Sequence, residues 1–328
     1  MRIAMIGSGA MGAMFGGRFA EVGADVVLYD IDVAHITAIA THGLHIVTPN
    51  GEIHIKLPAT SDPANIGKAE MAVILVDSNA TSAAARIAAT VLVPDGWALT
   101  LQNGIGNIEA LTAELGRDRL IAGTTYNSAA KLAPGRVLHS NIGDTVIGEL
   151  DGRTSARIEI IADLFRRAGL PIAVSDNVRG HIWMKFVLNC ALNPVSAVTG
   201  LRPGEIVRTE SARRFLERVL DEIMAVVAAK GLTLSEPDPR KAVFDHAWER
   251  YNRPSMLQHV EQGRPTEIDA LNGALLSEAK VLGVACPFNE AIVLTVKAIA
   301  ERAAARKTNP HLDEQALEAA ARSYTSPR

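Results

Sequence analysis

A lysine and two asparagines recur at intervals of four in a segment that is otherwise apolar. They are Lys185, Asn189 and Asn193, within His181–Pro194. A helix turns by about 100° per residue, so this spacing places the three side chains within about 80° of one another on one face. Because buried polar groups need partners, we expect this face to border a polar cleft. Burial disfavours the charged form of a lysine and makes it a better proton donor near neutral pH. The alternative is a lysine that extends to solvent from the helix edge.

Three further polar side chains are candidates for contact with a substrate. Ser255 follows a proline at a helix start, where its hydroxyl and the helix N–H groups could hold a carboxylate, although it could equally be a plain N-cap. Glu267 lies at the edge of an apolar stripe that includes Ile268 and Leu271 and could be half exposed, although a solvated first-turn glutamate is the default interpretation. Asn103 follows a predicted central strand, at the end where parallel sheets bind ligands, although an Asn-Gly turn there needs no ligand.

The chain begins with an apolar strand, a glycine-rich turn and a helix-like stretch. The turn is Gly7-Ser8-Gly9-Ala10-Met11-Gly12. In such a GxGxxG, the first glycine makes the turn, the second lets the backbone approach a pyrophosphate, and the third lets the helix press against the sheet. The helix N-terminus adds free N–H groups and a positive dipole. The sequence therefore predicts that residues 7–12 bind a dinucleotide, the alternative being a bare glycine turn.

An acidic residue, Asp30, follows the second predicted strand, eighteen positions after Gly12. The dinucleotide fingerprint places a carboxylate about there, where it accepts hydrogen bonds from the adenosine ribose. A 2′-phosphate would meet like charge, which costs up to about 4 kcal/mol at about 4 Å with an effective dielectric near 20. The sequence therefore favours NAD over NADP. The alternative is that Asp30 only ends the strand or caps the helix near Val33, for which Asp32 is an equally good cap.

Composition is that of a soluble globular protein with room for two domains. The chain has 328 residues, of which 48% are apolar and 21% charged, and its formal net charge is -3. The absence of a basic run argues against nucleic acid as a main partner. Apolar runs such as Met71–Val76 are far shorter than the ~20 residues of a membrane span. The first residues read as a strand and not as a secretory leader, so we expect a cytoplasmic protein.

The two cysteines and nine histidines form no pattern typical of a disulfide or a metal site. Cys190 and Cys286 lie among apolar neighbours, as buried thiols do in a reducing cytoplasm. No histidine belongs to an HExxH motif or is paired with a cysteine at ligand spacing. We therefore expect no metal.

In the first half of the chain, strand-like runs alternate with helical ones. The predicted strands span 2–6, 25–29, 44–47, 53–57, 71–76, 97–101, 119–123, 136–140, 145–148 and 171–174. The predicted helices span 10–22, 33–42, 79–90, 106–115 and 153–168. Such alternation is typical of an α/β fold with a doubly wound, mostly parallel sheet. We assign 1–176 to a dinucleotide-binding Rossmann domain.

Beyond about Asn177 the strand signals stop, and proline-broken helical segments follow. They span 178–192, 205–230, 239–250, 254–262, 266–282 and 287–305. We assign 177–306 to an all-helical substrate and catalytic domain, and 307–328 to a polar C-terminal tail. The apolar helical domain is consistent with a homodimer.

Five ordered motifs resemble the ketopantoate reductase (2-dehydropantoate 2-reductase) family over about residues 1–300. They are GSGAMG at 7–12, LQNGIGN at 101–107, GTTYNSA at 123–129, WMKFVLNCALNPVSAV at 183–198 and SMLQ…GRPTEIDALNG at 255–273. The lysine helix and the Thr-Glu-Ile-Asp segment are the most specific. The resemblance implies a Rossmann domain joined to a helical domain, with the active site between them.

The same resemblance implies a role for each candidate residue. Lys185 would be the general acid for carbonyl reduction, and Glu267 would help to place the lysine, the substrate or the cofactor ribose. Asn103 would lie near the nicotinamide and the substrate, and Ala129 would touch the cofactor through its backbone. The side chains that would hold the substrate are Asn189, Asn193 and Ser255.

Several positions depart from the family pattern. Asp30-Ile31 and Asp77 stand where most members carry basic residues suited to a 2′-phosphate, which again favours NAD. On the substrate side, Pro203 stands near a position where many relatives have Asn, and His259 stands where Asp is usual. These two changes leave the identity of the substrate open.

We therefore predict an NAD(P)-dependent oxidoreductase that moves hydride between nicotinamide and C2 of a small 2-oxo or 2-hydroxy acid. The leading interpretation is a 2-dehydropantoate 2-reductase-like enzyme that prefers NAD. The alternative is a relative acting on another acid, such as a D-2-hydroxyacid dehydrogenase. A non-catalytic dinucleotide-binding protein is a third interpretation, but it has no use for a buried proton donor such as Lys185.

Overall fold

The computed structural model describes residues 1–308 and residue 318 of the chain. Two compact units are present. The first comprises Met1–Phe186 with Thr233–Pro237, and the second comprises Val187–Leu232 with the described residues from Asp238 onward. The predicted tail, 307–328, lies outside the described residues except for Lys307, Thr308 and Glu318.

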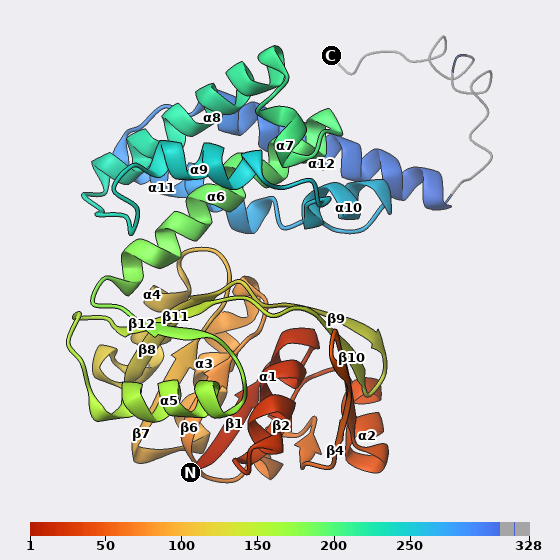
Figure 1. The fold of residues 1–328 in the computed structure, drawn as a ribbon, viewed down its shortest axis with the longest axis vertical. Helices are drawn as coiled ribbons and strands as arrows, with labels where there is room; N and C mark the ends of the chain where they lie inside the picture. Colours follow the sequence, from red (N-terminus) through yellow and green to blue (C-terminus); the bar gives the residue numbers. More distant parts are fainter. Residues whose placement is uncertain (309–317, 319–328) are drawn as a thin grey trace, which may run out of the picture. The chain divides into compact units, whose positions relative to one another are not determined.

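The first unit is built on an eight-stranded sheet (Figure 1). Its strands are β1 (Arg2–Ile6), β2 (Asp25–Tyr29), β5 (Ala59–Thr60), β6 (Ala69–Ile74), β7 (Leu92–Thr100), β8 (Leu120–Thr125), β11 (Thr145–Glu149) and β12 (Ile172–Val174). Their spatial order is β12-β11-β8-β7-β6-β1-β2-β5, and all neighbours are parallel except β8 and β11. The strand order reverses between β1 and β6, so the carboxyl ends of β1, β6, β7 and β8 share the edge where such sheets bind ligands.

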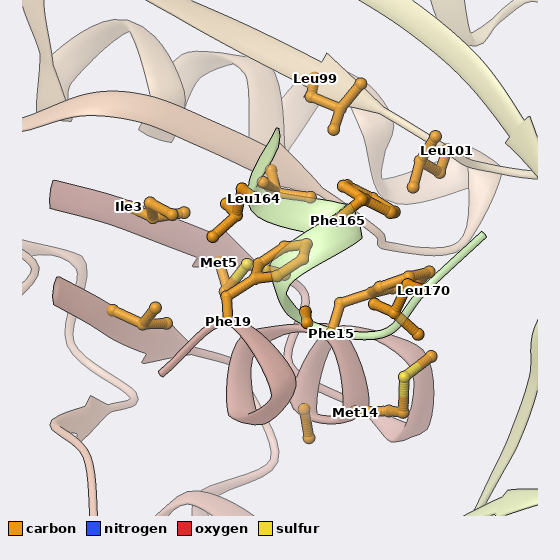
Figure 2. Close-up of a cluster of buried hydrophobic side chains, with 14 of the residues drawn as sticks. Ile3, Met5, Met14, Phe15, Phe19, Leu99, Leu101, Leu164, Phe165 and Leu170 are labelled. Atoms are coloured by element: carbon orange, nitrogen blue, oxygen red, sulfur yellow. The ribbon is translucent and has the colours of Figure 1, made fainter. Parts of the chain in front are cut away.

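Two apolar cores cover the two faces of this sheet, because successive strand residues point to opposite sides. On one face, Met5 of β1 packs with Phe15 and Phe19 of α1 (Ala10–Glu21) and with Phe165 of α5 (Ala156–Arg167), as Figure 2 shows. The rings of Phe19 and Phe165 lie 5.0 Å apart between centroids. On the other face, Ile6 packs with α3 (Thr81–Val91) and α4 (Asn107–Leu115). Burial of each large side chain contributes about 1.5–3 kcal/mol and holds the strand ends in place.

A second, four-stranded sheet lies in the same unit, in the order β4-β3-β10-β9. Its strands are β3 (Leu44–Thr48), β4 (Gly51–Ile55), β9 (Ser128–Ala133) and β10 (Arg136–Asn141). The sequence did not predict this separate sheet, nor β5 and β9. Strand β9 is mostly exposed and lacks apolar alternation, and β5 has two residues, so neither leaves a periodic signal. The remaining helices of the unit are α2 (Val33–His42) and the 3-10 turns η1 (Pro63–Asn65), η2 (Ser78–Ala80) and η3 (Arg117–Arg119).

The second unit is helical in its described residues. Helix α6 (Val178–Thr199) begins in the first unit and continues into the second. The other helices are α7 (Pro203–Ile206), α8 (Glu210–Ala229), α9 (Pro239–Trp248), α10 (Ser255–Glu261), α11 (Ala274–Leu282) and α12 (Pro287–Thr308). The predicted α/β fold class with a helical second part is thus confirmed. No helix within the described part of the chain is long and apolar enough to cross a membrane.

Three helix predictions in this half differ from the structure. The predicted helix 205–230 is two helices, α7 and α8, and the predicted helix 266–282 begins instead with a π-helical turn, η4 (Asp269–Gly273). The predicted end at residue 192 is wrong, because α6 runs through Pro194 to Thr199. Proline deprives the Cys190 carbonyl of its helical donor, and the side chain of Asn272 donates to that carbonyl instead, at 3.0 Å.

Candidate functional site

In the glycine turn after β1, the first and the third positions each require glycine, for different steric reasons. Gly7 has φ +91°, a conformation that side chains rarely adopt, and a Cβ on it would lie 2.7 Å from the Leu75 carbonyl carbon. A Cβ on Gly12 would lie 2.0 Å from the Gly7 oxygen. A Cβ on Gly9, in contrast, would meet no atom of the protein within 4 Å. Packing therefore requires glycine at 7 and 12, whereas at 9 the absence of a side chain leaves open space beside the backbone.

Helix α1 starts directly after this turn, with Gly9 as its N-cap and no side-chain cap. The first helical bond of this end runs from Ala13 N to Gly9 O, so the N–H groups of Ala10, Met11 and Gly12 have no acceptor within the helix. Ser8 is different: its hydroxyl donates to Met5 O and its backbone N–H bonds Tyr29 O. Ser8 thus ties the turn to β2 and, unlike Ala10–Gly12, does not point donors outward.

Asp30, at the end of β2, is half-buried and does not cap α2. Its Oδ1 accepts a hydrogen bond from Asp32 N at 2.9 Å, while Asp32 accepts the N–H of His35 as the helix cap. Asp32 also pairs with Lys131 of β9 at 2.5 Å, and this hydrogen bond is the main reason that the pKa of Asp32 is lowered. The capping role that the sequence left open between the two acids therefore falls to Asp32.

His35 lies buried between α2 and the hairpin of the second sheet. Its Nδ1 accepts the N–H of Gly135 at 3.0 Å. Burial lowers the pKa of His35, a smaller lowering comes from Lys131, and Asp32 and Asp30 act in the opposite direction. A neutral histidine therefore fixes the start of α2 behind Asp30.

The ammonium group of Lys185 is held at the carboxyl edge of the main sheet. Its Nζ donates to the Asn103 side-chain oxygen at 2.7 Å and to the backbone oxygen of Thr125. Asn103 follows β7 and Thr125 ends β8, and these are neighbouring parallel strands. The Tyr126 ring centroid lies 5.4 Å from Nζ. Lys185 is half-buried, and these contacts hold its ammonium against the sheet edge.

The loop that carries Asn103 is anchored by hydrogen bonds beneath it. The Asn103 backbone oxygen accepts from the side chains of Asn107, at 2.9 Å, and Ser78, at 3.2 Å. Gln102 is buried and its amide donates to Val76 O at 2.7 Å and to the Thr81 hydroxyl at 2.9 Å. The exposed Asn103 side chain therefore projects from a fixed backbone. Ala129 lies in β9, opposite His139 of β10.

The second unit carries the remaining sequence-predicted residues. Asn189 and Asn193 are half-buried on α6, and Ser255 is the exposed first residue of α10. Glu267 is exposed, as the default interpretation of a solvated glutamate predicts, but it precedes the π turn that begins at Asp269 and does not lie in a first helical turn. Within this unit Glu267 acts on His259: burial and Arg264 lower the pKa of His259, and Glu267 raises it. The charge of Glu267 is therefore felt at His259.

Residues that the sequence did not single out contact Lys185 or support its contacts. The Thr125 carbonyl and the Tyr126 ring contact the Lys185 ammonium, and the buried amide of Asn127 donates to the Thr125 hydroxyl. A backbone acceptor leaves no residue-type signal. The available clue was position, because the GTTYNSA segment ends a strand next to the one that leads to Asn103.

Family comparison identifies both halves of the chain. Residues 3–152 match the model of "Ketopantoate reductase PanE/ApbA", and residues 177–300 match that of "Ketopantoate reductase PanE/ApbA C terminal". The 2-dehydropantoate 2-reductase of Halobacterium salinarum is 32% identical over 289 residues, which cover 88% of this chain and 95% of that protein. The 2-dehydropantoate 2-reductase of Pyrococcus horikoshii is 33% identical over 300 residues, with 91% and 97% coverage.

Solved structures extend the comparison to a second activity. A PanE/ApbA family ketopantoate reductase from Ralstonia eutropha is 32% identical, with a TM-score of 0.83 over 92% of this chain and 99% of that one. A D-mandelate dehydrogenase in ternary complex with NADH and anilino(oxo)acetate is 25% identical, with a TM-score of 0.82 and the same coverage. Proteins similar to this chain are therefore named for two different substrates.

Proposed function

This chain belongs to the ketopantoate reductase family, and on that premise we propose that it is an NAD(H)-preferring reductase of small 2-oxo acids, with 2-dehydropantoate as the leading substrate. Its class is that of the NAD(P)-dependent oxidoreductases acting on CH-OH groups. The identity of the acid and the preference for NAD are the parts that we propose.

One observation carries the proposal: the Lys185 ammonium is held by Asn103 and Thr125 at the sheet edge that the glycine turn also occupies. Strands lie about 4.8 Å apart, so the ends of β7 and β8 are about 10–14 Å from the end of β1. A dinucleotide whose pyrophosphate rests on the start of α1 can extend its nicotinamide half over that distance. A cation there suits the carbonyl oxygen that gains charge during reduction.

The residues at this edge fit a dinucleotide. Gly9 and the N–H groups of Ala10–Gly12 would hold the pyrophosphate, and Asp30 would bind the adenosine ribose. When bound, the nicotinamide supplies or accepts the hydride. Lys185 would donate a proton to the developing alkoxide from Nζ, and Asn103 would orient that amine. In the second unit, we propose that Glu267 assists placement, and that the substrate is held by Asn189, Asn193 and Ser255.

The preference for NAD rests on charge. Asp30 carries its carboxylate where a 2′-phosphate would need a cation, and Asp77, in the turn after β6, is exposed and acidic. Lys131 is near the start of α2, but Asp32 neutralises it. The NADH in the similar D-mandelate dehydrogenase is consistent with this preference. A clear preference for NADPH in fluorescence titrations of the purified protein would overturn this part.

The second candidate function is oxidation of a D-2-hydroxy acid. Its support is the D-mandelate dehydrogenase, which was solved with an oxo acid and NADH and has a TM-score of 0.82 to this chain. Steady-state assays in both directions with a panel that includes 2-dehydropantoate and D-mandelate separate the two. A kcat/KM for 2-dehydropantoate with NADH at least about 10-fold above the rest supports the first, and the reverse ranking supports the second. Absence of turnover with every acid would favour a non-catalytic binder.

The homodimer and the cytoplasmic location stay predictions. Gel filtration of the purified protein tests the homodimer.

A further inference from the structure

The backbone acceptor of Lys185 belongs to a segment that a buried polar network fixes. The centre of this network is Asn127, which is 6% exposed. Its Nδ2 donates to Gly143 O at 2.7 Å and to the Thr125 hydroxyl at 2.9 Å, and lies 3.3 Å from the Thr145 hydroxyl. The two threonine hydroxyls are 2.8 Å apart. Asn127 therefore crosslinks the end of β8 to the start of β11.

Behind Asn127 lies His139, a fully buried histidine of β10. Its Nε2 is 2.9 Å from Asn127 Oδ1. Because the amide NH₂ of Asn127 already faces oxygens, its Oδ1 must accept and the imidazole must donate from Nε2. Burial lowers the pKa of His139, and Arg18 lowers it further, which favours the neutral ring that donates from Nε2. The histidine thus fixes which way the Asn127 amide faces.

The peptide between Thr125 and Tyr126 is held at both of its polar ends. Its N–H, on Tyr126, donates to Asp144 O at 2.8 Å, and its carbonyl, on Thr125, accepts from Lys185. Asn127 lies directly after this peptide, and its own N–H bonds the Thr125 hydroxyl at 3.2 Å. Rotation of this peptide plane would remove the carbonyl from Lys185, and the contacts of Asn127 oppose that rotation.

We propose that Asn127, backed by His139, is a positioning residue for the proton donor: it fixes the Thr125 carbonyl and thereby the place of the Lys185 ammonium. The inference rests on the proposed role of Lys185. A buried polar network gains little stability over an apolar turn, because its members must first lose their hydration. The network acts on geometry instead, because a displacement of about 1 Å at a reacting group can lower the rate by about 10²-fold.

A double-mutant cycle tests this inference, with Asn127→Ala and Lys185→Ala made singly and together. Rates are measured with NADH and the best 2-oxo acid of the panel. We expect Asn127→Ala to lower kcat by about 10-fold or more with little change in NADH affinity, and to have almost no effect in the Lys185→Ala background. Equal factors in both backgrounds would overturn the positioning role. An unchanged rate in Lys185→Ala alone would instead overturn the proposed function.

Milder variants keep the test decisive if Asn127→Ala folds poorly. Thr125→Val removes the hydroxyl but keeps the carbonyl, and His139→Gln keeps an amide donor that His139→Leu lacks. We expect Thr125→Val and His139→Leu to lower kcat and His139→Gln to restore part of it. Arg157→Gln is the matched control: it breaks the ion pair of the half-buried Arg157 with the buried Glu149, at the other end of the sheet from Lys185, so it should lower the melting temperature without lowering kcat.

A crystal structure of Asn127→Ala gives a readout that needs no substrate. We expect the Thr125 carbonyl and Lys185 Nζ to shift by about 1 Å or more. Unchanged positions of both atoms would overturn the inference.

Discussion

The Gly7 carbonyl oxygen occupies the place that a side chain on Gly12 would need, since a Cβ there would lie 2.0 Å from it. The oxygen belongs to backbone and cannot swing away as the end of a flexible side chain can. This contact locks the turn after β1 onto the first turn of α1. Gly9 stands between the two and has open space beside it.

Alanine at these two glycines should therefore have different effects. We expect Gly12→Ala to lower the free energy of unfolding by about 1–3 kcal/mol, because backbone must shift to admit the methyl group. Gly9→Ala should change stability by less than about 1 kcal/mol but weaken NADH binding by about 10-fold or more, because its methyl group fills the space that we assign to pyrophosphate. Urea unfolding and fluorescence titration measure the two effects. Unimpaired NADH binding by Gly9→Ala would contradict the assignment.

Asp30 and Asp32 offer a matched pair for the cofactor. Asp30→Ala should weaken NADH binding and raise the affinity for NADPH relative to NADH by about 10-fold or more, because a like charge is removed from the 2′ position. Asp32→Asn should instead cost about 1 kcal/mol of stability, because it weakens the cap of α2 and the pair with Lys131, and should leave the ratio nearly unchanged. A ratio that responds to Asp32 and not to Asp30 would show that the ribose lies elsewhere.

Asn272 should be coupled energetically to Pro194. Asn272→Ala leaves the Cys190 carbonyl without its donor and Asn289 Oδ1, 2.9 Å away, without its partner, so we expect a loss of about 2–3 kcal/mol. In a Pro194→Ala background, the N–H of residue 194 can bond the Cys190 carbonyl, and the cost of Asn272→Ala should fall by about 1 kcal/mol. Chemical denaturation of the four proteins measures this coupling. Equal costs in both backgrounds would rule it out.

Acid should destabilise the second unit through His246. Burial, aided by Arg250, lowers the pKa of His246 from 6.5 to about 4. Between these values the unfolded chain binds more protons than the folded one, so the free energy of unfolding falls as the pH falls. We expect a contribution of about 1–2 kcal/mol after allowance for the partial exposure of the ring, and His246→Gln should show a shallower loss of stability between pH 6.5 and 4. An identical slope for wild type and variant would contradict this.

The sequence predicted those parts of the fold whose signals are local. Strands with buried faces, such as β1 and β6, and the glycine turn carry their period or their steric need in the residues themselves. The end of α6 was missed because Pro194 normally stops a helix, and the compensating donor comes from Asn272, 78 positions later. The exposed strand β9 was missed because nothing in its composition requires a partner.

Some residues of the candidate site could likewise be found from the sequence, and others could not. Lys185 could be found from its type and its place on an apolar helix, and Asn103 from its place after a strand. The hydrogen bond of 2.7 Å between these two side chains forms only when the sheet has folded, so the sequence alone does not reveal it. The Thr125 carbonyl and the network of Asn127 and His139 could not be predicted, because a backbone acceptor and a buried amide acquire their roles only through three-dimensional contacts.

The most direct test of the account is the rate of NADH oxidation by wild type and Lys185→Ala, with the preferred 2-oxo acid at saturation and NADH binding measured in parallel. The account predicts a fall of about 10²-fold or more in turnover with nearly unchanged NADH affinity, the effect of losing a general acid. Equal turnover in the two proteins would contradict it and would leave the Lys185 ammonium without a part in the reaction.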